Sequence, residues 1–148
     1  MTSMSTGITI AAPAADIFAL ASQTERWPDI LPHYRYVRML KQRGATRTIE
    51  MSALRDAIPI TWVAEQTDDS RTPSIRFKHL RGWTRGMAVE WRFEPVAGGT
   101  RVTILHDLDF QFPVAADWLA KHVVGDFFVE NVAGKTLARI KAIAEGHT

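Results

Sequence analysis

A histidine in the middle of an apolar strand pattern is the first residue of this sequence that could do chemistry. Over residues 101–110, alternate positions share one apolar face: Val102, Ile104, His106, Leu108 and Phe110. An imidazole has an ordinary pKa of about 6.5, so His106 could take up or release a proton near neutral pH. A buried histidine is often only a structural hydrogen-bonding group, so both interpretations of His106 stay open.

Further polar side chains fall on the inward faces of the neighbouring predicted strands. Gln66, Arg55 and His79 each follow an apolar set on alternate positions. Leaving one buried polar group without a partner costs about 1–3 kcal/mol, and a small domain is stable by only about 5–15 kcal/mol. A solid core would therefore be hard to build around all of them. The pattern favours a cavity with apolar walls and a few polar groups, as in small-molecule sites.

The alternative is that some of these polar groups reach water at the ends of their strands. Arg55 and Arg81 stand near predicted strand ends and suit this interpretation, whereas His106 stands in mid-strand. Large aromatic side chains on the same inward faces, Trp62, Phe77 and Trp91, would form flat walls in either case.

The elements that must position these residues follow an α+β pattern. A short strand is expected at Ile8–Ile10, then a helix from Pro13 to about residue 22 and a second short helix that Thr24 could cap. Six strands are expected over 34–42, 46–56, 59–68, 74–81, 87–96 and 100–110. Their short connections, rich in Gly and Asp, predict an antiparallel meander. A long helix over about 115–145, with a break near Gly125, is expected to cover the apolar face of the sheet.

Composition predicts one globular domain spanning residues 1–148. Hydrophobic residues make up 46% and charged residues 23%, and the net charge of +2 is not gathered in one block, so nucleic-acid binding is not expected. The sequence contains no cysteine, which excludes disulfides and thiol chemistry, and its histidines show no metal-ligand spacing. We expect no cofactor, no metal and no membrane span, with a cytoplasmic location, and a homodimer stays open.

The order of these elements and several local segments resemble the START/Bet v 1-like (SRPBCC) superfamily, and in particular its polyketide cyclase/dehydrase family. The resembling segments are Ala12–Phe18, Glu25–Pro32, Trp91–Pro95, Gly98–Thr103 and Leu137–Lys141. The resemblance implies a helix-grip fold, in which a curved antiparallel sheet of about seven strands wraps around a long C-terminal helix and a hydrophobic pocket.

The resemblance extends to the aromatase/cyclases of aromatic polyketide synthesis. It implies that Trp27 and Tyr34 contribute to the pocket, and that His106 occupies the place of a histidine found on the last strand of some members. In that family an inward arginine on a middle strand acts as a proton donor or carbonyl clamp. The matching position here carries Gln66, and Arg55 on the neighbouring strand is the candidate substitute.

Cyclisation of a poly-β-ketone requires a folded chain, a base for an acidic α-proton and a donor that polarises a carbonyl. The predicted catalytic residues are His106, Arg55 and Tyr34. The predicted substrate-binding residues are Trp27, Trp62, Gln66, Phe77, His79, Trp91 and Phe127. The expected partner is a hydrophobic, aromatic or polyketide-like small molecule.

Two other functions remain open beside the cyclase. A non-catalytic carrier of a lipid or quinone shares the same fold, and so does an interaction module of ribosome-associated type. Gln66 in place of arginine favours the carrier, whereas His106 together with Trp27 and Tyr34 favours the cyclase. The hypothesis leans to a cyclase-like protein, with catalysis left undecided.

Overall fold

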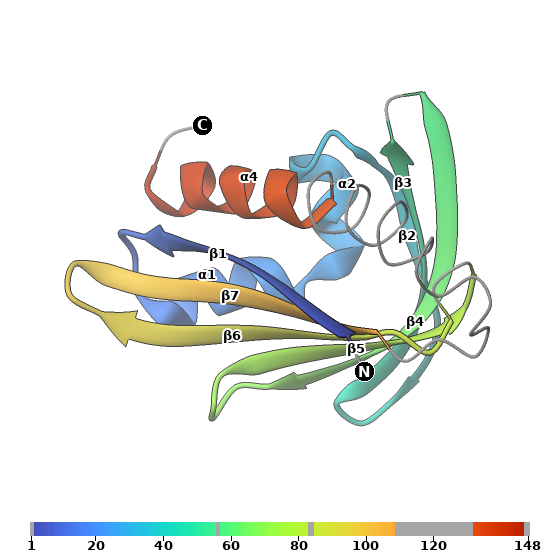
Figure 1. Ribbon diagram of the computed structural model, residues 1–148, viewed down its shortest axis with the longest axis horizontal. Coiled ribbons are helices and arrows are strands. Elements are labelled where there is room, and N and C mark those ends of the chain that lie inside the picture. The colour runs from blue at the N-terminus through green and yellow to red at the C-terminus, as the bar shows by residue number, and fades with distance from the viewer. Residues whose placement is uncertain (1, 56, 83–84, 109–131, 147–148) are drawn as a thin grey trace.

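A computed structural model of the chain describes residues 2–55, 57–82, 85–108 and 132–146 (Figure 1). The elements in chain order are β1 (Thr2–Ile10), α1 (Ala14–Ser22), the 3-10 helix η1 (Thr24–Arg26), α2 (Trp27–Ile30), β2 (Tyr34–Arg43), β3 (Thr46–Arg55), β4 (Ile58–Asp69), β5 (Ser74–Arg81), β6 (Ala88–Val96), β7 (Gly99–Leu108) and α4 (Gly134–Ala144). This order confirms the predicted α+β class, with short helices after the first strand and a helix near the C-terminus.

The strands form a single antiparallel sheet of seven strands in the order β1-β7-β6-β5-β4-β3-β2. Strands β2 to β7 form the predicted meander, and β1 returns to pair with β7 at the far edge. The sheet curves strongly, so that β4, β3 and β2 rise around the end at which α2 lies (Figure 1). This curvature encloses space on the concave side.

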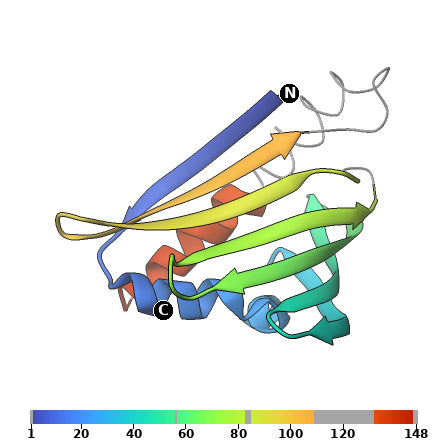
Figure 2. The ribbon, with the colours of Figure 1, turned by 90° about the horizontal axis from the view of Figure 1, so that it is seen from below.

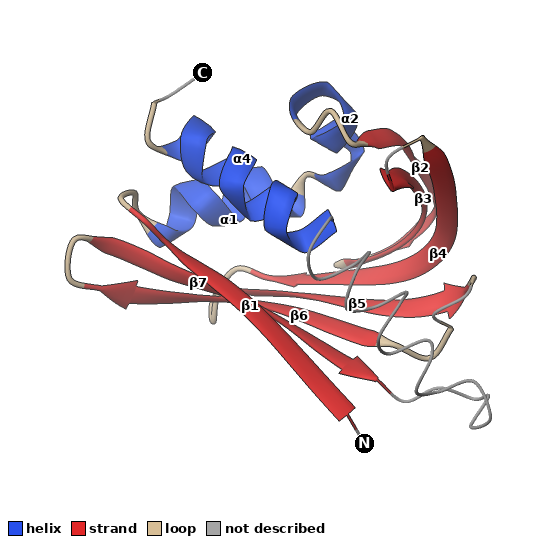
Figure 3. Cartoon of the chain, turned by 45° about the horizontal axis from the view of Figure 1, so that its top comes forward, coloured by secondary structure: helices blue, strands red, loops and turns tan. Residues whose placement is uncertain are grey.

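Both longer helices lie on that concave side, where α1 and α4 contact each other (Figures 2 and 3). Helix α4 places Thr136, Leu137 and Ile140 toward the sheet, because positions three or four apart share one face of a helix. The helix-grip architecture predicted from the resemblance is therefore confirmed.

The inward faces of the strands are those that alternation predicted. The buried members on β3 to β7 are Ile49, Met51, Ala53, Trp62, Ala64, Gln66, Ile75, Phe77, His79, Val89, Trp91, Phe93, Val102, Ile104 and His106. Arg81, the last residue of β5, is exposed, as its place at a strand end suggested. Polar side chains are therefore buried on the concave face of the sheet, and His106 is one of them.

Glycine is required where β7 begins beside the end of β1. A Cβ atom built on Gly99 would overlap the carbonyl oxygen of Ile10. The absence of a side chain allows the two backbones to approach closely, and the hydroxyl of Thr100 then donates to the carbonyl oxygen of Ala12 over 2.8 Å. These contacts fix the path from β1 into α1.

Three local features differ from the sequence predictions. Strand β1 is longer than Ile8–Ile10, because its first residues pair through their backbone with β7, from Thr2 opposite Leu108 onward, without an apolar pattern of their own. Thr24 does not cap a helix, since its hydroxyl donates to Gln66 instead. The expected helix over 115–145 is observed for Gly134–Ala144, and its earlier part, with the break near Gly125, lies outside the described residues.

Candidate functional site

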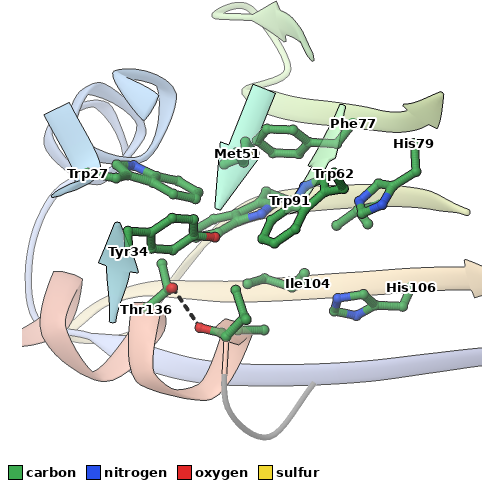
Figure 4. Close-up of a pocket in the computed structure, with 13 residues that line it drawn as sticks. Trp27, Tyr34, Met51, Trp62, Phe77, His79, Trp91, Ile104, His106 and Thr136 are labelled. Carbon is green, nitrogen blue, oxygen red and sulfur yellow. Dashed lines mark hydrogen bonds between the residues drawn. The ribbon is translucent and has the colours of Figure 1, made fainter. Parts of the chain in front are cut away.

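A pocket lies between the concave face of the sheet and the start of α4 (Figure 4). Its described lining residues are Trp27, Tyr34, Met51, Trp62, Phe77, His79, Val89, Trp91, Ile104, His106, Val132, Ala133 and Thr136. The interior of the pocket has a volume of about 40 Å³. The empty space reaches about 400 Å³ when the part open to solvent is included. The smaller value describes the interior, which has room for only a few water-sized molecules.

Aromatic rings form most of the pocket wall. Trp27 opens α2, because the proline after it suits the first turn of a helix. The Trp27 ring centroid lies 5.2 Å from that of Tyr34 and 5.8 Å from that of Trp91. These distances are typical of packed aromatic pairs, and the interplanar angles of 67° and 41° show that the rings face the pocket from different directions. The Trp27 Nε1 donor is buried and has no hydrogen-bond partner among the described residues.

His106 is held in the pocket by strand pairing on both sides. It lies opposite Met4 of β1 and Val89 of β6, and its side chain is 2% exposed. Burial disfavours the charged imidazolium and lowers the pKa of His106 from 6.5 to about 4. Its Nδ1 atom is buried and makes no hydrogen bond within the described part of the chain. His106 is therefore a neutral imidazole at neutral pH, with one ring nitrogen available to a ligand.

His79 lies on β5 on the same side of the pocket as His106 (Figure 4). Its ring stacks on that of Trp62, with centroids 5.9 Å apart and an interplanar angle of 3°. Burial, and to a lesser extent the neighbouring His106, lower the pKa of His79 to about 3. The pair of imidazoles is thus uncharged at neutral pH.

Tyr34 supplies a phenol to the same space. It is the first residue of β2, and the pairing of β2 with β3 shifts register between Tyr34 and Tyr36. The ring of Tyr34 extends into the pocket (Figure 4). Burial raises the pKa of Tyr34 well above its usual value, because the phenolate would be poorly solvated there. Its hydroxyl therefore keeps its proton and can donate a hydrogen bond.

Thr136 forms a polar part of the wall that was not predicted. Its hydroxyl donates to the carbonyl oxygen of Val132 over 2.6 Å, so the 3.1 Å contact with His33 has the His33 Nε2–H as the donor. Burial and then Lys135 lower the pKa of His33 to about 4, so this imidazole is neutral as well. The helical stripe that includes Ala133 and Ile140 passes through position 136, and this spacing was the signal that could have revealed Thr136.

Gln66 is buried but is not among the described residues that line the pocket. Its amide nitrogen donates to the Ser22 carbonyl oxygen over 2.9 Å and to Asp68 Oδ1 over 2.8 Å, and its amide oxygen accepts from Thr24 over 2.7 Å. This amide ties the end of α1 and the start of η1 to β4. The geometry thus gives Gln66 a structural task.

Two further predicted residues cannot be placed in the pocket. Arg55 is the last residue of β3 and lies opposite Ile58, and its side chain is outside the described residues. Phe127 also lies outside them. Of the predicted set, the pocket brings together Trp27, Tyr34, Trp62, Phe77, His79, Trp91 and His106.

The chemistry available in this pocket is hydrogen bonding within apolar walls. None of its described lining residues carries a full charge at neutral pH. Within the described ranges, no cluster of three or more histidine or acidic side chains could hold a metal ion. None of the helices described is long and apolar enough to cross a membrane.

Comparison with known proteins identifies the family. The sequence profile of "Polyketide cyclase / dehydrase and lipid transport" proteins matches residues 10–139, so the chain belongs to this family. A curated relative, the granaticin polyketide synthase bifunctional cyclase/dehydratase of Streptomyces violaceoruber, is 29% identical over 95% of this chain. The chain spans only 43% of the length of that protein.

Solved structures share the fold at lower identity. The Zhui aromatase/cyclase from Streptomyces sp. R1128 has a TM-score of 0.81 and 17% identity, and the match covers 97% of this chain and 93% of that one. A START superfamily protein from Mycobacterium smegmatis has a TM-score of 0.75 and 16% identity, with coverage of 95% and 98%. At such identities the likeness establishes the fold alone.

Proposed function

We propose that this protein binds a flat, oxygen-bearing hydrophobic molecule of polyketide type in the pocket and promotes its cyclisation and dehydration. The observation that carries the proposal is the Nδ1 atom of His106, which has no hydrogen-bond partner among the described residues and is buried among aromatic side chains. A hydroxyl or carbonyl-derived enol on such a ligand would satisfy this nitrogen. The cyclase/dehydratase name of the curated relative and the family match support the same choice of ligand.

The proposed reaction uses neutral groups. Nδ1 of His106 takes a proton from a carbon between two carbonyls, and the resulting enolate carbon forms a bond to a second carbonyl carbon of the same chain. Tyr34 donates a hydrogen bond to the oxygen of that second carbonyl as negative charge develops there. The alkoxide takes the proton held by His106 and becomes a hydroxyl. Neutral His106 then removes the remaining proton from the carbon that attacked and passes it to this hydroxyl, which leaves as water while a ring double bond forms.

Low basicity limits His106 to substrates whose α-protons are already acidic. A base with a pKa of about 4 is a weak proton acceptor, so positioning must supply much of the rate. The aromatic side chains of Trp27, Trp62 and Trp91 fit this role, because large rings around the pocket limit the conformations that a flexible chain can adopt there.

A ring-sized ligand requires the walls to separate, since the enclosed space measures about 40 Å³. Met51 is the lining residue best suited to move, because its unbranched side chain has several rotatable bonds. The ring of Phe77 lies beside it in the pocket (Figure 4). We propose that a ligand displaces these side chains on binding and leaves the backbone of the sheet in place.

The second candidate function is a carrier that binds the same class of molecule without reaction. The uncharged character of the described lining favours it, because no described cation is available to stabilise an enolate. Quinones and lipids, which need burial more than charge, would suit such a pocket.

Matched substitutions of the two tyrosines separate these functions. Tyr34→Phe removes the hydroxyl in the pocket, whereas Tyr36→Phe removes one on β2 whose ring lies under Arg35 and Arg38. With a poly-β-ketone thioester as substrate, we expect Tyr34→Phe to lower kcat by about 100-fold and Tyr36→Phe to leave it unchanged. Binding of naphthol, followed by tryptophan fluorescence, should change by less than about threefold in both variants.

Two results would contradict the enzyme proposal. Binding of naphthol by the wild-type protein without turnover of the thioester would assign the carrier function. Equal loss of turnover in Tyr34→Phe and Tyr36→Phe would remove the pocket hydroxyl from the mechanism. A filled pocket provides the further control, since Ala133→Leu should abolish naphthol binding in a protein that still unfolds cooperatively.

A further inference from the structure

A second hollow lies on the other side of α4, at the surface. It is lined by Pro32, His33, Leu54, Lys135, Ala138, Arg139 and Ala142, and it has a volume of about 600 Å³. It is formed where α4 lies beside the turn between α2 and β2 (Figure 3), and the Arg139 Nε–H donates to the Ile30 carbonyl oxygen over 3.0 Å to join these elements. We call this hollow the α4 groove.

The α4 groove is distinct from the internal pocket. The hydrogen bond between His33 and Thr136 stands between them, because His33 lines the groove while Thr136 lines the pocket. The groove is also far larger than the enclosed space of the pocket, and its volume falls within the range of about 300–1,000 Å³ that is typical of small-molecule sites.

The charges of the α4 groove are of one sign. Lys135 and Arg139 stand four residues apart, so both project from the same side of α4. Within the described ranges neither forms an ion pair, and no acidic residue is among the described residues lining the groove. His33 is neutral, so the two cations are the charged groups of the lining.

The remaining lining is apolar and small. Leu54, Ala138 and Ala142 form its surface, with Pro32 at the margin. Two alanines on one side of a helix leave room for a chain to lie along it. The groove therefore combines an apolar track with a pair of cations, which together complement an amphipathic anion.

We propose that the α4 groove binds an amphipathic small molecule with one anionic headgroup, a carboxylate or a phosphate, held by Lys135 and Arg139. The alkyl part lies along Leu54, Ala138 and Ala142. The guanidinium of Arg139 keeps its Nε–H bond to Ile30, so its terminal nitrogens are the ones directed to the anion. This site goes beyond the internal pocket and does not depend on the reaction proposed for it.

Calorimetric titration with dodecanoate, dodecyl phosphate and dodecanol, each as a monomer in solution, tests the proposal. We expect the two anions to bind and the alcohol to bind at least about tenfold more weakly. Lys135→Glu should weaken binding of both anions by at least about tenfold, and added salt should weaken it in the wild type. Arg71→Glu is the control, because Arg71 is almost fully exposed in the turn after β4 and carries the same charge.

Steric block and pocket-filling variants place the bound chain. Ala138 is exposed, so Ala138→Trp should leave folding intact, fill the groove and abolish binding of dodecanoate. Ala133→Leu, which fills the internal pocket, should leave dodecanoate binding unchanged. Equal binding of dodecanol and dodecanoate, an unaffected Lys135→Glu variant, or loss of binding in Ala133→Leu alone would each overturn the proposal, whatever becomes of the reaction proposed for the pocket.

Discussion

Acid should destabilise this protein through its buried neutral histidines. The pKa of His106 is lowered to about 4 and that of His79 to about 3, whereas both have a pKa of about 6.5 in an unfolded chain. At pH values between the folded and unfolded pKa, the two imidazoles bind protons in the unfolded chain but not in the folded protein. The free energy of unfolding therefore falls as the pH drops below about 6.5, and the full contribution is present only above that pH.

The size of the effect follows from the unfolded pKa alone over most of this range. At about pH 5 both histidines are still neutral in the folded protein. Each therefore lowers the free energy of unfolding by about 1.4 kcal/mol per pH unit, over the roughly 1.5 units from pH 6.5 to pH 5. This amounts to about 2 kcal/mol for His106 and about 2 kcal/mol for His79, a large part of the stability of a small domain. His33, whose pKa is also lowered to about 4, acts in the same direction.

Urea unfolding followed by tryptophan fluorescence at several pH values measures this loss. We expect the wild type to lose about 4 kcal/mol more between about pH 7 and pH 5 than a double variant, His79→Gln with His106→Gln. His33→Gln, the comparison variant, should remove a smaller part of the slope. A double variant with the same pH slope as the wild type would show that these two imidazoles are solvated or charged in the folded protein.

Two substitutions test the packing that positions the pocket. Gln66→Leu should lower the free energy of unfolding, measured by chemical denaturation, by about 2–4 kcal/mol, because it leaves the hydroxyl of Thr24 buried without its acceptor. A loss below about 1 kcal/mol would contradict the stabilising role of this hydrogen-bond network. Gly99→Ala should destabilise the protein by about 2 kcal/mol or more, because the added Cβ overlaps the Ile10 carbonyl oxygen. Gly44→Ala places its Cβ in open space and should cost only about 1 kcal/mol, through backbone strain at a positive φ. Equal shifts of the melting temperature in the two variants would contradict this explanation.

The sequence was most informative where structure depends on local alternation. Because side chains on a strand point to opposite faces in turn, the positions of Trp62, His79 and His106 on one face follow from their spacing alone. The curvature of the sheet brings these side chains close together, and this curvature was predicted from the resemblance to a known family. This is why the buried members of the pocket could be named before the fold was known.

Side-chain partners across the fold could not be predicted in the same way. Gln66 was expected to reach a ligand, but its amide bonds Ser22, Thr24 and Asp68, and such a network depends on how α1 and η1 meet β4. The extension of β1 rests on backbone pairing with β7, which leaves no apolar signal in Thr2–Gly7. The volume of the pocket also depends on the distance between α4 and the sheet, a quantity that side-chain patterns do not encode.

The proposed function depends on Nδ1 of His106, which no described residue hydrogen-bonds, accepting a polar group of a ligand within the aromatic pocket. Long-range proton–nitrogen spectra of the histidine rings during a naphthol titration test it most directly. We expect the His106 Nδ1 resonance to move in a saturable way while the resonances of His33 stay in place. Saturable binding of naphthol with unchanged His106 resonances would contradict the claim.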